Sequence, residues 1–86
     1  MEINFTKPFK KAYFKLSEKD RLRVDKALVL FIEDRTNPAL RNHSLKGKME
    51  GRFSFSAAHD LRIVYREEHE SLYIFLIDVG SHNQVY

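Results

Sequence analysis

The spacing of apolar residues changes once along this chain, at Pro38, and this change constrains the fold more than any other feature. Before Pro38 the apolar residues recur at helical spacing, and after it they alternate with polar residues as in a strand. Helices are therefore expected first and a sheet afterwards. A chain of 86 residues can bury one hydrophobic core but not two, so residues 1–86 are predicted to form a single domain.

Two helices are predicted before Pro38. The first follows an N-cap at Thr6, and the second follows a capping sequence that begins at Ser17. The second helix should end at Thr36-Asn37-Pro38, because proline cannot continue it. The apolar faces consist of Phe9, Ala12, Tyr13 and Leu16 in the first helix and of Val24, Ala27, Leu28 and Phe31 in the second.

Strands are predicted in the second half of the chain. Apolar residues alternate with polar ones at Phe53 and Phe55 and again from Leu61 to Tyr65, which is typical of half-buried strands. The nearly continuous apolar run from Leu72 to Val79 indicates a central strand. The polar segments between these strands, 57–60 and 67–71, are predicted to be turns.

A further short strand is predicted at the N-terminus, at Ile3 and Phe5. The fold class is then α+β: a short N-terminal strand, two helices, and an antiparallel β-meander with the helices packed on one sheet face. Successive side chains of a strand point to opposite faces, so the sheet face away from the helices is predicted to be polar and basic. The residues expected on that face are Ser54, Ser56, Arg62 and Arg66.

The charge distribution favours a polyanionic partner without requiring one. Lys and Arg number 15 against 12 Asp and Glu, which gives a formal net charge of +3. The basic excess is concentrated between Arg41 and Arg66, where the only acidic residues are Glu50 and Asp60. One contiguous third of the chain is therefore the expected site of contact with such a partner.

Several function classes fit the sequence poorly. The chain has no cysteine, so neither disulfides nor thiolate metal sites are available, and its four histidines lack the spacing of a structural metal site. No glycine-rich phosphate loop is present. The N-terminus lacks a secretory pattern, and the longest apolar stretch, Ala27–Ile32, is too short to span a bilayer. A cytoplasmic protein without membrane association, metal or cofactor is expected.

Three segments together resemble a known family: Asn42–Gly47, Asp60–Arg66 and Asp78–Tyr86. In this order they are similar to the RelE/ParE superfamily of toxins from type II toxin–antitoxin systems, nearest the YafQ-like mRNA interferases. The resemblance spans nearly the whole chain, since length and element order also match. It implies a RelE-like microbial RNase fold and an endoribonuclease that cleaves mRNA without a metal.

The resemblance implies catalytic roles for His82 and Arg62. His82 follows the last apolar strand, where an imidazole that titrates near neutral pH can give or take a proton. Arg62 lies in the strand that matches the family, where a guanidinium can bind the scissile phosphate and stabilise its developing charge. Which residue acts as acid and which as base stays open.

Supporting roles are implied for His43, Asp60 and Tyr86. His43 and Asp60 match active-site residues of YafQ-like toxins, although Asp60 also suits a simple turn. Tyr86 matches the closing aromatic residue of the family, which suits either stacking on a base or packing on the sheet. The predicted phosphate-binding surround consists of Lys46, Lys48, Arg52 and Arg66.

The chain also departs from the family pattern. YafQ-like toxins carry an Asp and a His where this chain has Ser54 and Ser56, so one acid/base candidate is missing. The second tail arginine of RelE proteins is missing as well, and His82 lies near its position. These departures leave room for an inactive relative that only binds an antitoxin or nucleic acid.

The resemblance implies three partners: mRNA, the translating ribosome, and a cognate antitoxin that blocks the basic face. A disordered acidic segment that folds on a basic patch is physically reasonable. The alternative function is that of a ParE-like toxin, which poisons DNA gyrase without catalysis. The histidine of Gly80-Ser81-His82 favours the nuclease, because ParE-like proteins generally lack it.

Overall fold

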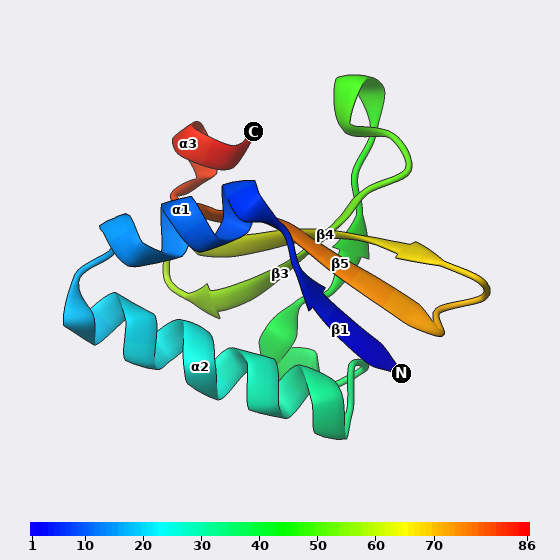
Figure 1. Cartoon of the computed structure of the whole chain (residues 1–86), viewed down its shortest axis with the longest axis horizontal. Helices are drawn as coiled ribbons and strands as arrows, with labels where there is room; N and C mark the ends of the chain where they lie inside the picture. Colours follow the sequence, from blue (N-terminus) through cyan, green and yellow to red (C-terminus); the bar gives the residue numbers. More distant parts are fainter.

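The computed structural model describes residues 1–86 and contains a five-stranded sheet with two helices packed on one face (Figure 1). This arrangement confirms the predicted α+β class and the predicted order of elements. The elements are β1 (Glu2–Phe5), α1 (Lys7–Lys15), α2 (Glu18–Glu33), the 3₁₀ turn η1 (Pro38–Leu40), β2 (His43–Ser44), the 3₁₀ turn η2 (Gly47–Met49), β3 (Phe53–Ala58), β4 (Leu61–Glu68), β5 (Tyr73–Gly80) and α3 (His82–Val85).

The strands lie in the order β1-β5-β4-β3-β2. Strands β3, β4 and β5 form the predicted antiparallel meander. Strand β1 pairs in parallel with β5, and the two-residue β2 pairs with β3 through His43 and Ser44. Neither pairing could be predicted from the sequence. Strand β2 is too short to show alternation, and the apolar residues of β1 do not indicate which strand lies beside it.

Both helices begin at the predicted caps. Thr6 Oγ1 accepts a hydrogen bond from the backbone N–H of Phe9 at 3.4 Å, and Ser17 Oγ accepts one from Asp20 at 3.1 Å. Helix α2 ends at Glu33, ahead of Pro38. None of the helices has the length and apolar content needed to cross a membrane.

The core lies between the two helices and the sheet. Phe31 of α2 stacks on Phe55 of β3 with ring centroids 4.6 Å apart, and it meets Tyr65 of β4 edge-on at 5.1 Å. Burial of Phe55, Ile63 and Tyr65 on this side confirms the predicted face assignment. The buried cluster contains Phe9, Val24, Ala27, Phe31, Leu40, Phe55, Leu61, Ile63, Tyr65, Ile74, Leu76 and Val79.

The predicted turns were too long. Ala57 and Ala58 belong to β3, and Glu67 and Glu68 belong to β4, so the hairpins turn only at 59–60 and 69–72. Polar composition did not end these strands, because cross-strand pairing uses the backbone and tolerates polar side chains near a hairpin. The chain reverses where the backbone turns left-handed, with φ of 54° at Asp60.

A polar network joins the end of α2 to the sheet. Arg35 donates to the Tyr65 hydroxyl at 3.1 Å and to the Glu67 carboxylate at 2.8 Å, and Tyr65 donates to Asn42 Oδ1 at 2.8 Å. Burial tends to raise the pKa of Glu67, but hydrogen bonds from Ser71 and Arg35 outweigh it and lower the pKa. Because Asn42 precedes His43, the network anchors the segment that leads into the candidate site.

Candidate functional site

The last residues fold back as α3 onto the sheet face opposite α1 and α2. Contacts of α3 with β4 and β5 hold it there, and Ser81 and Gln84 cap its start reciprocally. Gly80 permits this return, since a Cβ at that position would lie 2.7 Å from Gln84 Oε1. Sequence periodicity did not reveal this helix, because four residues are too few to show a repeat.

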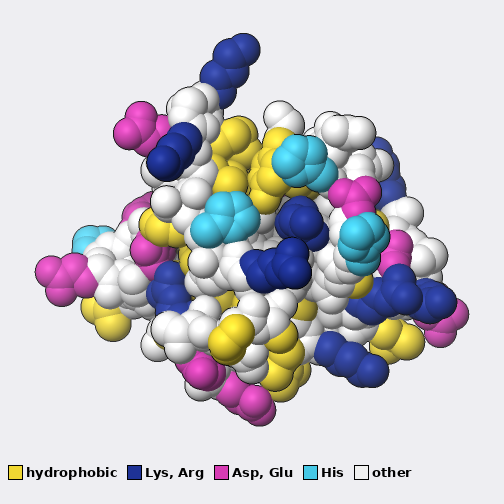
Figure 2. Space-filling model, turned by 180° about the vertical axis from the view of Figure 1, so that it is seen from behind, with side chains coloured by type: hydrophobic (Ala, Val, Ile, Leu, Met, Phe, Trp, Pro, Cys, Tyr) yellow, Lys and Arg dark blue, Asp and Glu magenta, His cyan; other side chains and the backbone are white.

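This face, called here the far face, is less uniformly polar than predicted. Ser54 and Val64 lie opposite each other on β3 and β4 and are fully buried, and Val85 of α3 is also buried although it lies outside the main core. Around this small buried patch the surface is polar. Figure 2 shows histidine side chains gathered around basic side chains on the side of the molecule seen from behind.

Asp60 fixes the start of α3. Its carboxylate accepts a hydrogen bond from the backbone N–H of His82 at 3.0 Å, while its own backbone makes the left-handed turn between β3 and β4. Asp60 therefore forms the predicted turn, and its carboxylate also contacts the segment that carries His82. The carboxylate holds the His82 backbone rather than the imidazole, so the imidazole stays exposed at the surface.

Tyr86 packs against the site and does not fray. Its hydroxyl donates a hydrogen bond to Ser54 Oγ, and its ring meets the His82 imidazole edge-on with centroids 4.6 Å apart. The side chain nevertheless remains 40% exposed. The position combines packing on the sheet with a ring surface that a base can reach.

His43 faces the same side of the sheet. It lies directly opposite Ser54 in the β2–β3 register, and its Nδ1 lies 2.8 Å from the carbonyl oxygen of Arg41. A carbonyl only accepts hydrogen bonds, so Nδ1 must carry a proton and donate it. In the neutral imidazole this leaves Nε2 as the free acceptor, which is the state a general base requires.

Arg62 occupies the neighbouring position on this face. It lies opposite Ser56 in the β3–β4 register and opposite Gly80 in the β4–β5 register. Its Nη1 donates to Ser56 Oγ at 3.0 Å and to the carbonyl oxygen of Ala58 at 3.3 Å. These bonds use one nitrogen and hold the guanidinium in place while the others stay available to a phosphate.

The two serines connect these side chains. Ser54 binds Tyr86 and lies opposite His43, and Ser56 binds Arg62. Residues two apart on a strand share a face and are about 7 Å apart. The far face thus brings together His43, Arg62, Tyr86 and, through its contact with Tyr86, His82. In the sequence, the two serines stood out only as departures from the family pattern. Their hydrogen bonds could not be predicted, because these depend on how the strands are paired.

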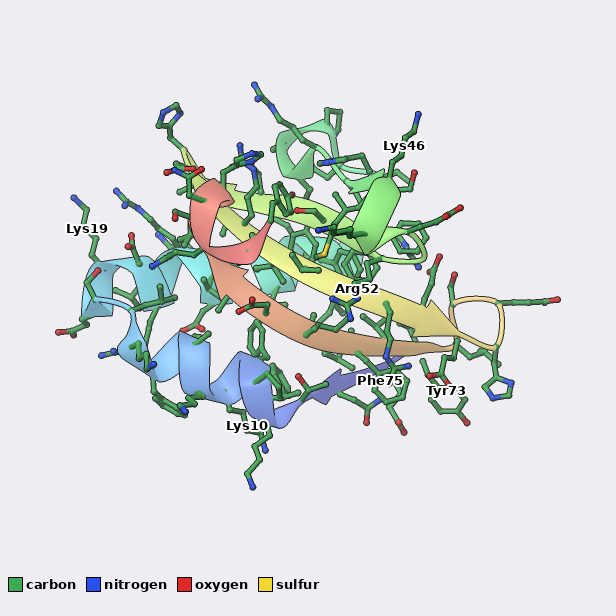
Figure 3. The ribbon with its side chains drawn as sticks, turned by 90° about the horizontal axis from the view of Figure 1, so that it is seen from above. Lys10, Lys19, Lys46, Arg52, Tyr73 and Phe75 are labelled. Atoms are coloured by element: carbon green, nitrogen blue, oxygen red, sulfur yellow. The ribbon has the colours of Figure 1, made fainter.

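The four residues predicted to bind phosphate are not equivalent. Lys46 extends from its loop on the side opposite α1, from which Lys10 extends (Figure 3). Lys48 and Arg52 are exposed. Arg66 is ion-paired with Glu68, and its guanidinium lies 4.1 Å from the centre of the Phe75 ring, so it is less available than the others.

No group of three or more His, Cys, Asp or Glu side chains is placed to hold a metal ion. The side chains on this surface include imidazoles, a guanidinium and hydroxyls. Imidazoles transfer protons near neutral pH, and a guanidinium stabilises a phosphate whose charge increases.

Comparison with known proteins agrees with this architecture. A family model for the bacterial toxin YafQ of type II toxin–antitoxin systems matches residues 1–86. No curated protein matches the chain. Solved structures share the fold, among them YafQ from E. coli, with 17% sequence identity, coverage of 99% of this chain and 97% of that chain, and a TM-score of 0.80.

Two further structures show the same likeness. The E. coli DinJ-YafQ complex is 18% identical over 99% of this chain and 97% of that chain, with a TM-score of 0.77. A metal-bound toxin from Helicobacter pylori is 24% identical over 100% of this chain and 99% of that chain, with a TM-score of 0.73. The match to the family model over all 86 residues shows that this chain belongs to the YafQ family of type II toxin–antitoxin toxins and has their RelE/ParE-like fold.

Proposed function

We propose that the protein is an endoribonuclease that cleaves mRNA on the translating ribosome and so inhibits translation. The observation that carries the proposal is the gathering of His43, Arg62, His82 and Tyr86 on the far face, around Ser54 and Ser56. Membership of a toxin family supports an activity that inhibits cell growth. The exposed imidazoles support a reaction that depends on proton transfer.

The proposed reaction uses the ribose 2′-hydroxyl of the substrate as the nucleophile. A base removes the 2′-proton, the 2′-oxygen bonds to phosphorus, and the bond from phosphorus to the 5′-oxygen breaks as an acid protonates that oxygen. The products are a 2′,3′-cyclic phosphate and a 5′-hydroxyl. The protein needs no nucleophile of its own, and its tasks are proton transfer and stabilisation of the phosphorane.

The roles follow from the surroundings of each side chain. His82 is the principal proton-transfer group, because its imidazole is exposed beside the ring of Tyr86. His43 supports it through its free Nε2, and Arg62 stabilises the phosphate. Asp60 acts through the His82 backbone as a positioning residue, and Tyr86 stacks on a base.

Besides mRNA and the ribosome, we propose a cognate antitoxin as a partner. The family belongs to type II toxin–antitoxin systems, and a structural relative forms the DinJ-YafQ complex. Besides the basic far face, which the antitoxin is expected to block, this chain offers a second surface between β1, α1 and α2, where the apolar residues lining a hollow include Phe5, Phe9, Tyr13 and Phe14. Phe14 is 71% exposed and Phe5 is 48% exposed, so this hollow has an apolar rim open to a partner.

Primer extension on mRNA after induction tests the proposal. Wild-type protein should arrest growth and produce new 5′ ends at fixed positions within translated codons. His82→Ala should lower the cleavage rate by about 10²–10⁴-fold, the usual contribution of a general acid or base. His69→Ala is the matched control, since His69 is an exposed histidine in the turn between β4 and β5 and should leave cleavage unchanged.

Two other outcomes would contradict the nuclease proposal. Growth arrest that survives His82→Ala, with translation intact and DNA damage signalling raised, would replace the nuclease with a gyrase poison of the ParE type. Absence of both cleavage and arrest with wild-type protein would identify an inactive relative.

A further inference from the structure

A hollow of about 310 Å³ lies at the edge of the far face, next to the site described above, and shares Ser56 and Arg62 with it. Three of its lining residues are cationic or become so on protonation: Arg41, His59 and Arg62. The other lining residues are Ser56 and three alanines, so no carboxylate faces the space. The hollow lies beside the part of β3 that β2 does not cover, because β2 pairs only with Phe53 and Ser54.

Both guanidiniums in the hollow are free of carboxylate partners. The ion pairs of the molecule involve Arg23, Arg35 and Arg66, and none involves Arg41 or Arg62. Arg62 uses only Nη1 for its bonds to Ser56 and Ala58, which leaves its other nitrogens unbonded. Two unpaired guanidiniums that line one concave surface with no acidic residue form a site for a tetrahedral oxyanion.

Hydrogen bonds on both sides hold the backbone of Arg41. Its N–H donates to the carbonyl oxygen of Pro38 at 3.2 Å, and its own carbonyl accepts from His43 Nδ1 at 2.8 Å. Its backbone is left-handed, with φ of 49° and ψ of 42°, which is uncommon for a residue other than glycine. The strained position, fixed on both sides, sets the direction in which the side chain leaves the backbone.

We propose that this hollow is a phosphate-binding subsite in which Arg41 is the principal residue and Arg62 and His59 are its neighbours. In the endoribonuclease proposed above, on which this step rests, the phosphate belongs to single-stranded RNA and lies next to the cleaved one. It is not the cleaved phosphate, because His43, His82 and Tyr86 do not line the hollow. Arg62 lies between the two phosphates, since it lines the hollow and also pairs with Gly80 beside α3.

The hollow can be tested without any nuclease activity. Inorganic phosphate added to the protein should shift the NMR resonances of the Arg41 and Arg62 side chains and of the His59 amide, in a saturable way. The same titration of Arg41→Gln should lose saturation. Shifts that spread over all basic residues, or that persist unchanged in Arg41→Gln, would show an adventitious ion only and would overturn the proposal.

The RNA step uses a fluorescein-labelled 2′-O-methyl hexanucleotide, which binds but cannot be cleaved by attack of its own 2′-oxygen. For single strands, log K falls with log salt by about 0.7 for each phosphate contact, so loss of one contact corresponds to about five-fold weaker binding at ~0.1 M salt. Arg41→Gln should show this loss and a salt slope smaller by about 0.7. Arg23→Gln on α2 is the control, because Arg23 is already paired with Asp20, and it should bind like wild type.

Kinetics with a cleavable RNA separate loss of the subsite from loss of the nuclease activity. With a cleavable RNA, Arg41→Gln should raise KM about five-fold and leave kcat unchanged, because a flanking phosphate contributes to binding and not to the transition state. An unchanged KM and salt slope, or a lower kcat with unchanged KM, would overturn the subsite while cleavage stands. Arg41-dependent binding in a protein that cleaves nothing would retain the subsite and refute the nuclease.

Discussion

The two faces of the same sheet are held by different interactions. On the helix side, Phe31, Phe55 and Tyr65 pack ring against ring and are almost completely buried. On the far face, a four-residue helix covers a small patch, and Tyr86, Arg62 and the His82 backbone are held by the hydrogen bonds that they donate to Ser54, Ser56 and Asp60, respectively. The helix side is therefore expected to supply most of the stability, while polar contacts on the far face leave the His82 imidazole exposed.

The largest expected effect comes from breaking the helix side. Phe31→Ala removes a fully buried ring between α2 and the sheet and should lower the free energy of unfolding by about 3–5 kcal/mol. Urea denaturation followed by circular dichroism measures this loss. Phe14→Ala, which removes an exposed ring of the same kind, should change stability by less than about 0.5 kcal/mol. Equal losses in the two variants would show that burial of the Phe31 ring against the sheet is not the source of its contribution to stability.

A smaller effect is expected on the far face, and it should appear in activity rather than in stability. Ser56→Ala removes the oxygen that accepts from Arg62, and the cleavage rate should fall about ten-fold as the guanidinium loses its position. The free energy of unfolding should change by less than about 1 kcal/mol. Single-turnover cleavage and urea denaturation of the same samples separate the two quantities.

Two matched variants sharpen this test. Ser56→Thr keeps the hydroxyl and should restore most of the activity, while Ser44→Ala removes an exposed serine from β2 and should have no effect. A rate for Ser56→Ala equal to wild type would show that the hydrogen bond to Arg62 does not position it for catalysis.

The smallest effect concerns how the stability contributed by the Arg35–Tyr65–Glu67 network, which joins the end of α2 to the sheet, changes with pH. The pKa of Glu67 is lower in the folded protein than its ordinary value of 4.5. Its stabilising contribution is therefore fully present above the ordinary pKa and is lost as the pH falls through the folded pKa. Because Glu67 is partly exposed, the contribution should be about 1 kcal/mol or less.

Comparison of Glu67→Gln with wild type measures this contribution. The difference in the free energy of unfolding should be largest near pH 7 and should shrink towards zero under strongly acidic conditions. A difference that stays constant over this range would mean that the Arg35–Glu67 pair contributes through packing rather than charge.

Much of the fold could be predicted from periodicity and caps. Thr6 and Ser17 begin the two helices as expected, and the alternation in β3 and β4 assigned Phe55 and Tyr65 to the core correctly. The prediction missed α3, because its four residues show no repeat and its position depends on contacts with β4 and β5. It also made the turns too long, because Ala57, Ala58, Glu67 and Glu68 belong to strands despite their place beside polar turn residues.

The candidate site divides in the same way. The resemblance pointed to His43, Arg62, His82 and Tyr86, and alternation assigned Arg62 to the far face. Neither could indicate that Arg41 shares a hollow with Arg62, because these residues come from a 3₁₀ turn and a strand that are distant in sequence. The tautomer of His43 could not be predicted from the sequence either, because it depends on the hydrogen bond from Nδ1 to the Arg41 carbonyl.

Residue type and spacing along the chain were enough to predict the order of helices and strands, the apolar side of each, and the family. Three further features came from the three-dimensional structure: which strands are neighbours, how the tail packs on the far face, and which polar groups are hydrogen-bonded to each other. Side-chain periodicity is a local property, whereas strand register and hydrogen bonding join residues far apart in the sequence.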